Sequence, residues 1–134
     1  MSGQIAYHLE EVQKMLGDFV LRIHQLDIKQ GESFCVLGPT GSGKTTLLRI
    51  LSGLEPPTEG DVCFGDRPVQ NGELDLMNRR RIAMVFQRPL LLRGSVRKNV
   101  EFPLRLRGQL HQRSEYVDAI LEQLRLTPLV SQSA

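Results

Sequence analysis

Cysteine and long apolar runs are both scarce in this chain of 134 residues. The two cysteines, Cys35 and Cys63, stand 28 positions apart with no C-x-x-C pair and no paired histidines. This spacing gives no sign of a zinc or redox site, and both are expected to be small core residues. The longest apolar stretches are far shorter than a membrane span, and the N-terminus lacks a basic region followed by an apolar core. A cytosolic chain is therefore expected.

The charge of the chain is small in total but uneven along the sequence. The net charge is +2, yet residues 79–113 hold nine arginines and Lys98 against Glu101 alone. Such a segment can face nucleic acid, an acidic protein, an anionic membrane surface, or solvent. Charge alone does not choose among these. With 40% hydrophobic residues, no repeat and no linker, residues 1–134 are expected to form one domain.

One motif predicts a ligand. A stretch of eight residues fits the pattern G-x-x-x-x-G-K-[ST]. It consists of Gly38, Pro39, Thr40, Gly41, Ser42, Gly43, Lys44 and Thr45. Glycines let consecutive backbone N–H groups face one anion, and the helix that follows adds its dipole. The pattern predicts a cup for nucleotide phosphates, with Lys44 between the outer phosphates, Thr45 on magnesium, and Thr46 among the nucleotide-binding residues.

The surrounding pattern is typical of an α/β protein with an antiparallel hairpin at its N-terminus. Apolar runs predict strands before the loop and before Gln87, and a helix from the loop to near Gly53. Ser95 and Ser114 are the expected N-caps of two later helices. The second of these carries a core-facing stripe at Val117, Ile120, Leu121 and Leu124. The predicted strands cover 5–16, 19–28, 33–37, 61–64 and 82–86, and the predicted later helices cover 96–100 and 114–126.

The chain resembles the N-terminal half of the ATP-binding subunit of an ABC transporter, a P-loop NTPase. The residues that carry the resemblance fall in the family's order over nearly the whole chain. They are Gly31-Glu32, the loop from Gly38 to Thr45, Leu47 to Leu54, Pro57-Thr58-Glu59-Gly60 and Val85 to Leu91. The resemblance implies an ABC ATPase fold with an antiparallel β subdomain, with ATP and Mg2+ as ligands.

Gln87 gains a role only through this resemblance. It follows an apolar run, 43 residues after Lys44, where the family's glutamine reaches the magnesium ion or its water. Lys44 and Gln87 are thus the expected catalytic residues, and Thr45 and Gln87 the expected metal ligands. The resemblance also implies a membrane-embedded permease as partner, a second nucleotide-binding subunit, a position on the inner face of the cell membrane, and no nucleic acid. Arg88, Arg93, Arg97 and Lys98 would lie at the permease contact.

The sequence departs from the family at the position that stacks on adenine. That position falls on Leu16, which has no π face, and Phe19 or Tyr7 is the expected substitute. The stretch from Leu16 to Phe19 is similar to that of molybdate or tungstate importers, an oxyanion group.

A second departure concerns catalysis. The family's signature Leu-Ser-Gly-Gly-Gln, second magnesium aspartate, water-activating glutamate and sensor histidine do not occur before Ala134. The expectation is nucleotide binding with turnover near background, because phosphoryl transfer needs metal and water positioned together. If the chain did hydrolyse ATP, the first carboxylates to test as catalytic residues would be Asp61, Asp66 and Asp75.

Two other functions are possible for this sequence. One is a non-catalytic product that binds nucleotide or permease, and the other is an unrelated P-loop enzyme such as a GTPase or small-molecule kinase.

Overall fold

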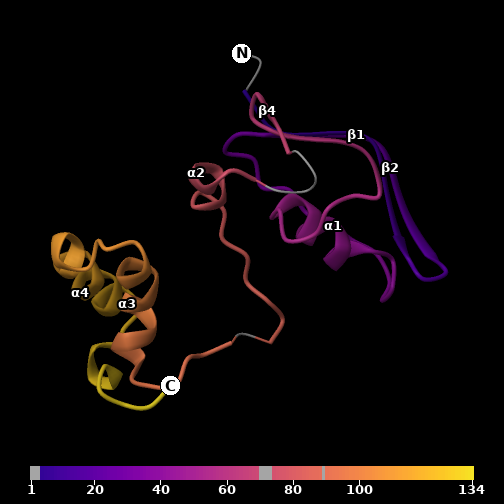
Figure 1. Ribbon diagram of the computed structural model, residues 1–134. Helices are drawn as coiled ribbons and strands as arrows, with labels where there is room; N and C mark the ends of the chain where they lie inside the picture. The colour runs from indigo at the N-terminus through magenta and orange to yellow at the C-terminus, as the bar shows by residue number, and fades with distance from the viewer. Residues whose placement is uncertain (1–3, 70–73, 89) are drawn as a thin grey trace. The chain divides into compact units, whose positions relative to one another are not determined.

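The computed structural model describes residues 4–69, 74–88 and 90–134. They form two compact units, Met1–Met84 and Val85–Ala134, each of which is described by itself (Figure 1). No helix in these residues is long and apolar enough to cross a bilayer.

The first unit is built on a four-stranded antiparallel sheet in the order β2-β1-β3-β4. Its strands are β1 (Ile5–Leu16), β2 (Phe19–Lys29), β3 (Glu59–Phe64) and β4 (Arg67–Pro68). The predicted N-terminal hairpin is confirmed, and Gly17-Asp18 form its two-residue turn, with Leu16 opposite Phe19. Strand β3 begins two residues earlier than the sequence pattern predicts.

Helix α1 (Lys44–Leu51) packs on one face of this sheet, as Figure 1 shows. The helix buries Leu47, Ile50 and Leu51, which are spaced three and four residues apart and so lie on one side. They meet the buried sheet residues Leu9, Val12, Ile28 and Val62. Ser52 is the C-cap, and the helix ends at the predicted place before Gly53. This cluster holds α1 against the sheet.

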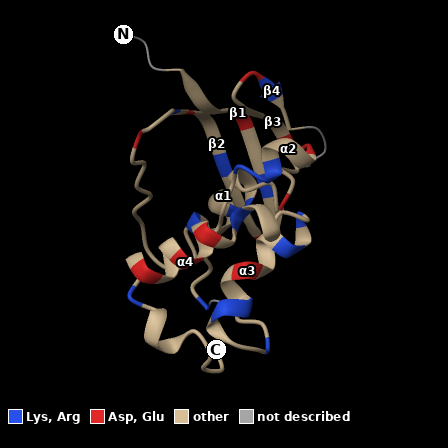
Figure 2. Ribbon diagram, turned by 90° about the vertical axis from the view of Figure 1, so that its left-hand side faces the viewer, with Lys and Arg blue, Asp and Glu red and all other residues tan. Residues whose placement is uncertain are grey.

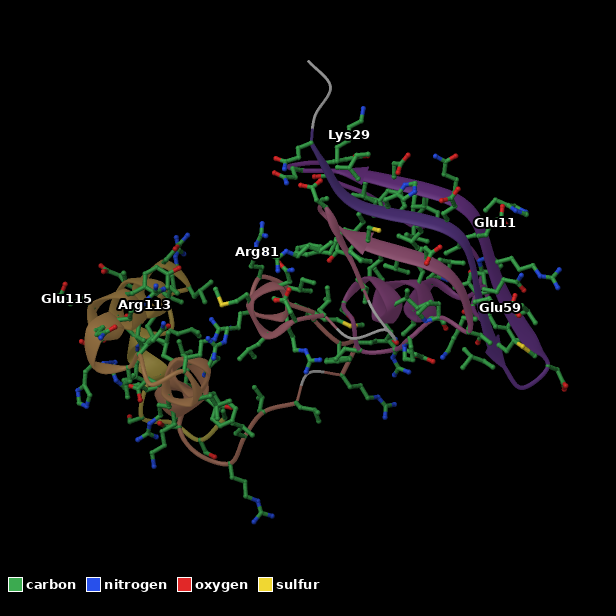
Figure 3. All side chains as sticks on the ribbon, turned by 45° about the horizontal axis from the view of Figure 1, so that its top comes forward. Glu11, Lys29, Glu59, Arg81, Arg113 and Glu115 are labelled. Carbon is green, nitrogen blue, oxygen red and sulfur yellow. The ribbon has the colours of Figure 1, made fainter. Side chains whose placement is uncertain are left out.

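The sheet contains one irregularity, where β1 passes β3. The register shifts between Glu10 and Gln13, and Glu11 has the unusual backbone angle φ 47°. Gly60 lies opposite with φ 84°, and a Cβ built there would be 2.2 Å from the Glu11 carbonyl oxygen. Figure 3 labels Glu11 and Glu59 on these neighbouring strands. Only glycine allows so close an approach of two backbones.

The predictions of strands at 33–37 and 82–86 are wrong. Both segments lack regular structure, and no described residue pairs with them as a strand. A strand needs a hydrogen-bonding neighbour, which apolar side chains do not supply. Val36 packs against the core, whereas Leu37 is 87% and Val85 90% exposed. The prediction that Cys35 is a core residue is also wrong, since it is exposed on this segment; Cys63 is half-buried.

In its described residues, the second unit consists of two helices and two short 3₁₀ turns. The helices are α3 (Val96–Leu106) and α4 (Ser114–Gln123), and the turns are His111–Arg113 and Thr127–Leu129. Ser95 caps α3 as predicted, because its side chain accepts from the N–H of Lys98. The helix runs beyond the predicted end, through Pro103. The N-cap prediction at Ser114 is wrong, since Ser114 is itself helical and follows directly on a 3₁₀ turn.

Only part of the apolar stripe predicted on α4 is buried in the second unit. Val117 and Leu121 are buried and Ile120 is half-buried, but Leu124 is 61% exposed. Asn99 of α3 joins the preceding chain to the helix. Its side-chain oxygen accepts from the N–H of Leu92 at 2.7 Å, and its amide donates to the Leu92 carbonyl at 2.9 Å.

A histidine on the sheet gives the first unit a pH-dependent contribution to stability. His8 Nδ1 lies 2.5 Å from Asp27 Oδ1 across the β1–β2 pair, and this hydrogen bond raises the pKa of His8 above 6.5. A raised pKa in the folded state stabilises the fold below the unfolded value, and the gain is lost as pH rises through the folded value.

We therefore expect the difference in unfolding free energy between the natural protein and His8→Gln to shrink from about pH 5 to about pH 9. Urea unfolding at several pH values measures it. A difference that grows with pH would contradict this assignment.

Candidate nucleotide-binding site

The predicted phosphate loop occupies residues 38–45, and helix α1 begins inside it at Lys44. Gly43 stands just before the helix with φ 91°, a left-handed conformation that favours glycine. Among the residues that the structure describes, no side chain caps this end of α1. The buried face of the helix holds the start of α1 against the sheet, so the loop is attached to the first unit's core.

The start of α1 presents free hydrogen-bond donors. Within the described part of the chain, the backbone N–H groups of Lys44, Thr45 and Thr46 have no acceptor. The N–H of Ser42 is used internally and donates to the Pro39 carbonyl at 3.3 Å. Free N–H groups at the positive end of a helix dipole favour an anion, and phosphate matches both features.

Lys44 adds a full positive charge to the loop. Its Nζ donates to the carbonyl oxygens of Gly38 at 2.8 Å and Pro39 at 2.6 Å. These contacts hold the ammonium across the loop, and no carboxylate of the described residues pairs with it. A hydrogen-bonded ammonium without a counter-ion is a suitable partner for a phosphate group.

The structure brings all the predicted loop residues together. Gly38 and Pro39 supply the carbonyls that hold Lys44, while Thr40 and Gly41 are exposed. A Cβ on Gly38 would lie 2.8 Å from the Ser42 hydroxyl, so glycine makes room for that side chain. Thr45 is exposed and Thr46 half-buried at the start of the helix.

Gln87 belongs to the second unit, where it is exposed. Its part in the site, like that of Thr45 on magnesium, therefore stays a prediction. The described ranges contain no group of three or more His, Cys, Asp and Glu side chains that could hold a metal ion.

Of the alternative carboxylates, Asp75 has a structural role. It is the N-cap of the short helix α2 (Leu76–Arg79), where it accepts from the N–H of Asn78 at 2.9 Å. It also lies 3.3 Å from Arg67. The hydrogen bond from Asn78 lowers the pKa of Asp75 below its usual value. Asp61 is exposed in β3, and Asp66 lies in the turn before β4.

The two aromatic candidates for a base-stacking role lie at opposite ends of the hairpin. Tyr7 is near the end of β2, and its ring packs against Phe64 with centroids 5.0 Å apart. Phe19 follows the turn, and its ring approaches the phosphate loop: a Cβ on Gly43 would lie 3.1 Å from Phe19 Cζ. Leu16, opposite Phe19, is 42% exposed.

One arginine of the basic segment is neutralised within the second unit. Arg97 of α3 contacts Glu101 at 3.0 Å and Asp118 of α4 at 2.7 Å. Figure 2 shows basic residues on α3 and only acidic ones on α4. Arg97 therefore links α3 to α4. Because its positive charge is paired with carboxylates, the basic segment 79–113 has less unpaired positive charge than its sequence predicts. Arg88, Arg93 and Lys98 form no ion pair with the described residues.

Comparison with known proteins places this loop in a family. The family model described as ABC transporter matches residues 21–134. The chain is 44% identical over 101 residues to a sulfate/thiosulfate import ATP-binding protein of Rhizobium meliloti, covering 74% of this chain and 27% of the relative. It is 39% identical over 129 residues to a trehalose/maltose import ATP-binding protein of Thermococcus litoralis, covering 92% and 35%. The chain thus spans about a third or less of these relatives.

Solved structures agree with the sequence relatives. A nucleotide-free ATP-binding cassette from an ABC transporter matches with a TM-score of 0.72 and 26% identity, covering 97% of this chain and 58% of the other. The protein cbiO1 from Clostridium perfringens, part of the ABC transporter complex cbiONQ, matches with a TM-score of 0.74 and 27% identity, covering 97% and 54%. The fold is that of an ABC ATPase with an N-terminal antiparallel sheet. This chain belongs to the ABC transporter family and carries part of its ATP-binding domain.

Proposed function

We propose that this chain binds Mg-ATP through residues 38–46 as the nucleotide-binding part of an import transporter. The proposal rests on three N–H groups, those of Lys44, Thr45 and Thr46, that have no acceptor among the described residues. They lie beside the Lys44 ammonium, which is held by the Gly38 and Pro39 carbonyls and has no counter-ion in the described part of the chain. A triphosphate carries several negative charges, so a cup with donors, a cation and no opposing carboxylate suits it. Relatives named as import ATP-binding proteins support the choice of ATP.

Magnesium would be held by the Thr45 hydroxyl and the Gln87 carboxamide, together with phosphate oxygens. Both protein groups are uncharged oxygen ligands of the kind this hard cation accepts, and Thr45 is exposed beside the free N–H groups. The ion would neutralise charge on the outer phosphates.

The proposed partners are a membrane-embedded permease and a second nucleotide-binding subunit, at the cytoplasmic face of the membrane. Arg88, Arg93 and Lys98 would face the permease. For the transported solute we propose a tetrahedral oxyanion, such as molybdate or tungstate. The similarity at Leu16 to Phe19 supports this class, and the Rhizobium meliloti relative is named for sulfate and thiosulfate, which are also oxyanions.

Magnesium dependence tests the site. We expect Mg2+ to raise the ATP affinity of the natural protein and to have little effect on Thr45→Ala, because the hydroxyl ligand is gone. Thr45→Ser keeps the hydroxyl and should restore the response. Calorimetric titration with and without Mg2+ measures both. An equal response of Thr45→Ala and the natural protein would contradict the assigned role, and failure of the natural protein to bind ATP would contradict the proposed function.

A further inference from the structure

A cavity of about 240 Å³ lies in the first unit, at the end of the sheet away from the β1–β2 turn. The chain reaches it at the start of β1, just after β2, at the turn between β3 and β4, and just after α2. Its lining consists of Ala6, Gln30, Gly31, Phe64, Gly65 and Arg81. Figure 3 labels Arg81 and Lys29, the last residue of β2, at this end of the sheet. Pockets for drug-sized ligands measure roughly 300–1,000 Å³, so this cavity suits a smaller molecule.

The cavity carries one positive charge. Among the residues that line it, only Arg81 is charged, and its guanidinium forms no ion pair or hydrogen bond with the described residues. Two carboxylates stand next in the sequence to lining residues, but neither lines the cavity. Glu32 accepts from the N–H of Lys29 at 2.8 Å, and Asp66 is exposed in the turn before β4. Arginine stays charged throughout the physiological pH range, so the cavity favours an anion.

The ring of Phe64 positions the guanidinium. Arg81 Cζ lies over this ring, 5.3 Å from its centroid, and the ring packs in turn against Tyr7 with centroids 5.0 Å apart. A stacked guanidinium uses its flat face on the ring and keeps the N–H groups at its edge for other partners. Two parallel N–H donors match the two oxygens of a carboxylate, and a fork that is already held in place loses less freedom on binding.

The rest of the lining is uncharged and leaves room beside the guanidinium. Ala6 is small, and a Cβ built on Gly31 or Gly65 would meet nothing within 4 Å. The exposed Gln30 carboxamide can donate or accept a hydrogen bond. A single cation beside neutral, partly apolar walls suits a monoanion with an apolar body. Phosphate and sulfate carry more charge and more acceptor oxygens than one guanidinium can satisfy.

We propose that this cavity binds a small carboxylic acid in its ionised form. The two carboxylate oxygens accept from the Arg81 guanidinium, and the apolar body lies against the Phe64 ring and the backbone of Gly31 and Gly65. The site shares no residue with the phosphate loop 38–45 and lies at the other end of the β1–β2 hairpin from the turn. It therefore goes beyond the proposed function and does not require bound nucleotide.

Benzoate is the probe, because it joins a carboxylate to a flat apolar body. The isotope-labelled full chain is titrated without nucleotide, and each amide resonance is followed by NMR. We expect saturating shifts on Gly31 and Gly65, with a Kd on the order of 1 mM, as is usual for a ligand of this size. Benzamide, which keeps the body without the charge, and inorganic phosphate should each bind at least about tenfold more weakly.

Variants of two neighbouring arginines test the assigned residue. Arg81→Ala should weaken benzoate binding about tenfold or more, and Arg81→Lys should weaken it about fivefold because the charge stays but the planar fork is lost. Arg80→Ala is the matched control, since Arg80 is equally exposed but does not line the cavity. It should keep benzoate affinity within about twofold. Mg-ATP affinity should be the same in Arg81→Ala and the natural protein.

Several results would overturn the proposal. Equal benzoate affinity for Arg81→Ala and the natural protein would do so, as would equal weakening in Arg81→Ala and Arg80→Ala, which would indicate general charge attraction. Binding of benzamide or phosphate as tight as that of benzoate would exclude a carboxylate site. No saturable binding of benzoate, or shifts confined to residues 38–46, would exclude this cavity. None of these results would bear on ATP binding at the phosphate loop.

Discussion

Replacing Lys44 with alanine is expected to weaken Mg-ATP binding about 10- to 100-fold. The ammonium is already positioned by the carbonyls of Gly38 and Pro39, so little ordering is required when phosphate arrives. The substitution removes the only full charge in the cup and leaves the three N–H groups. Calorimetric titration of both proteins with Mg-ATP measures the change.

Lys29→Ala is the matched control for this experiment. It removes the same charge from the end of β2 away from the hairpin turn, where Figure 3 labels Lys29. Affinity should be unchanged there, and thermal unfolding midpoints should confirm that both variants are folded. Equal Mg-ATP affinity for Lys44→Ala and the natural protein would contradict the assignment of the phosphate site.

Gly60→Ala is expected to destabilise the first unit by about 3 kcal/mol or more. The new Cβ would lie 2.2 Å from the Glu11 carbonyl oxygen and 2.6 Å from Val12 Cα. These are backbone atoms of β1, which cannot rotate away as a side chain does. The positive φ of Gly60 adds strain for any other residue. Urea unfolding followed by circular dichroism measures the loss.

Gly65→Ala provides the control for Gly60→Ala. Gly65 also has a positive φ, 59°, but a Cβ there meets nothing within 4 Å. Its cost should be limited to backbone strain, about 1 kcal/mol. Similar losses for the two variants would mean that the close approach of β3 to the β1 bulge does not limit stability.

The sequence predicts best those elements whose signals are local. The hairpin is readable because Gly17-Asp18 separates two alternating runs, and α1 because Lys44 opens an apolar stripe at helical spacing. The strands at 33–37 and 82–86 are mispredicted because strand formation depends on a neighbour, which a segment's own composition does not reveal. Ser114 is mispredicted as a cap because the preceding 3₁₀ turn continues directly into α4.

In the candidate site, too, the local features are predicted from the sequence and the features that depend on tertiary packing are not. The loop is predicted by the motif, since glycine at 43 and lysine at 44 are required by the chemistry of phosphate binding. The contact of Phe19 with Gly43 is not readable from the sequence, where Phe19 and Tyr7 are equal candidates. It depends on α1 packing under the hairpin through Leu47 and Ile50.

In the proposed function, the backbone N–H groups at the start of α1 bind the phosphates of ATP. The most direct test is an NMR titration of the isotope-labelled chain with Mg-ATP, following each amide resonance. We expect the largest shifts to fall on Gly43, Lys44, Thr45 and Thr46 and to saturate together. Saturating shifts confined to other parts of the chain, with these four amides unmoved, would contradict it.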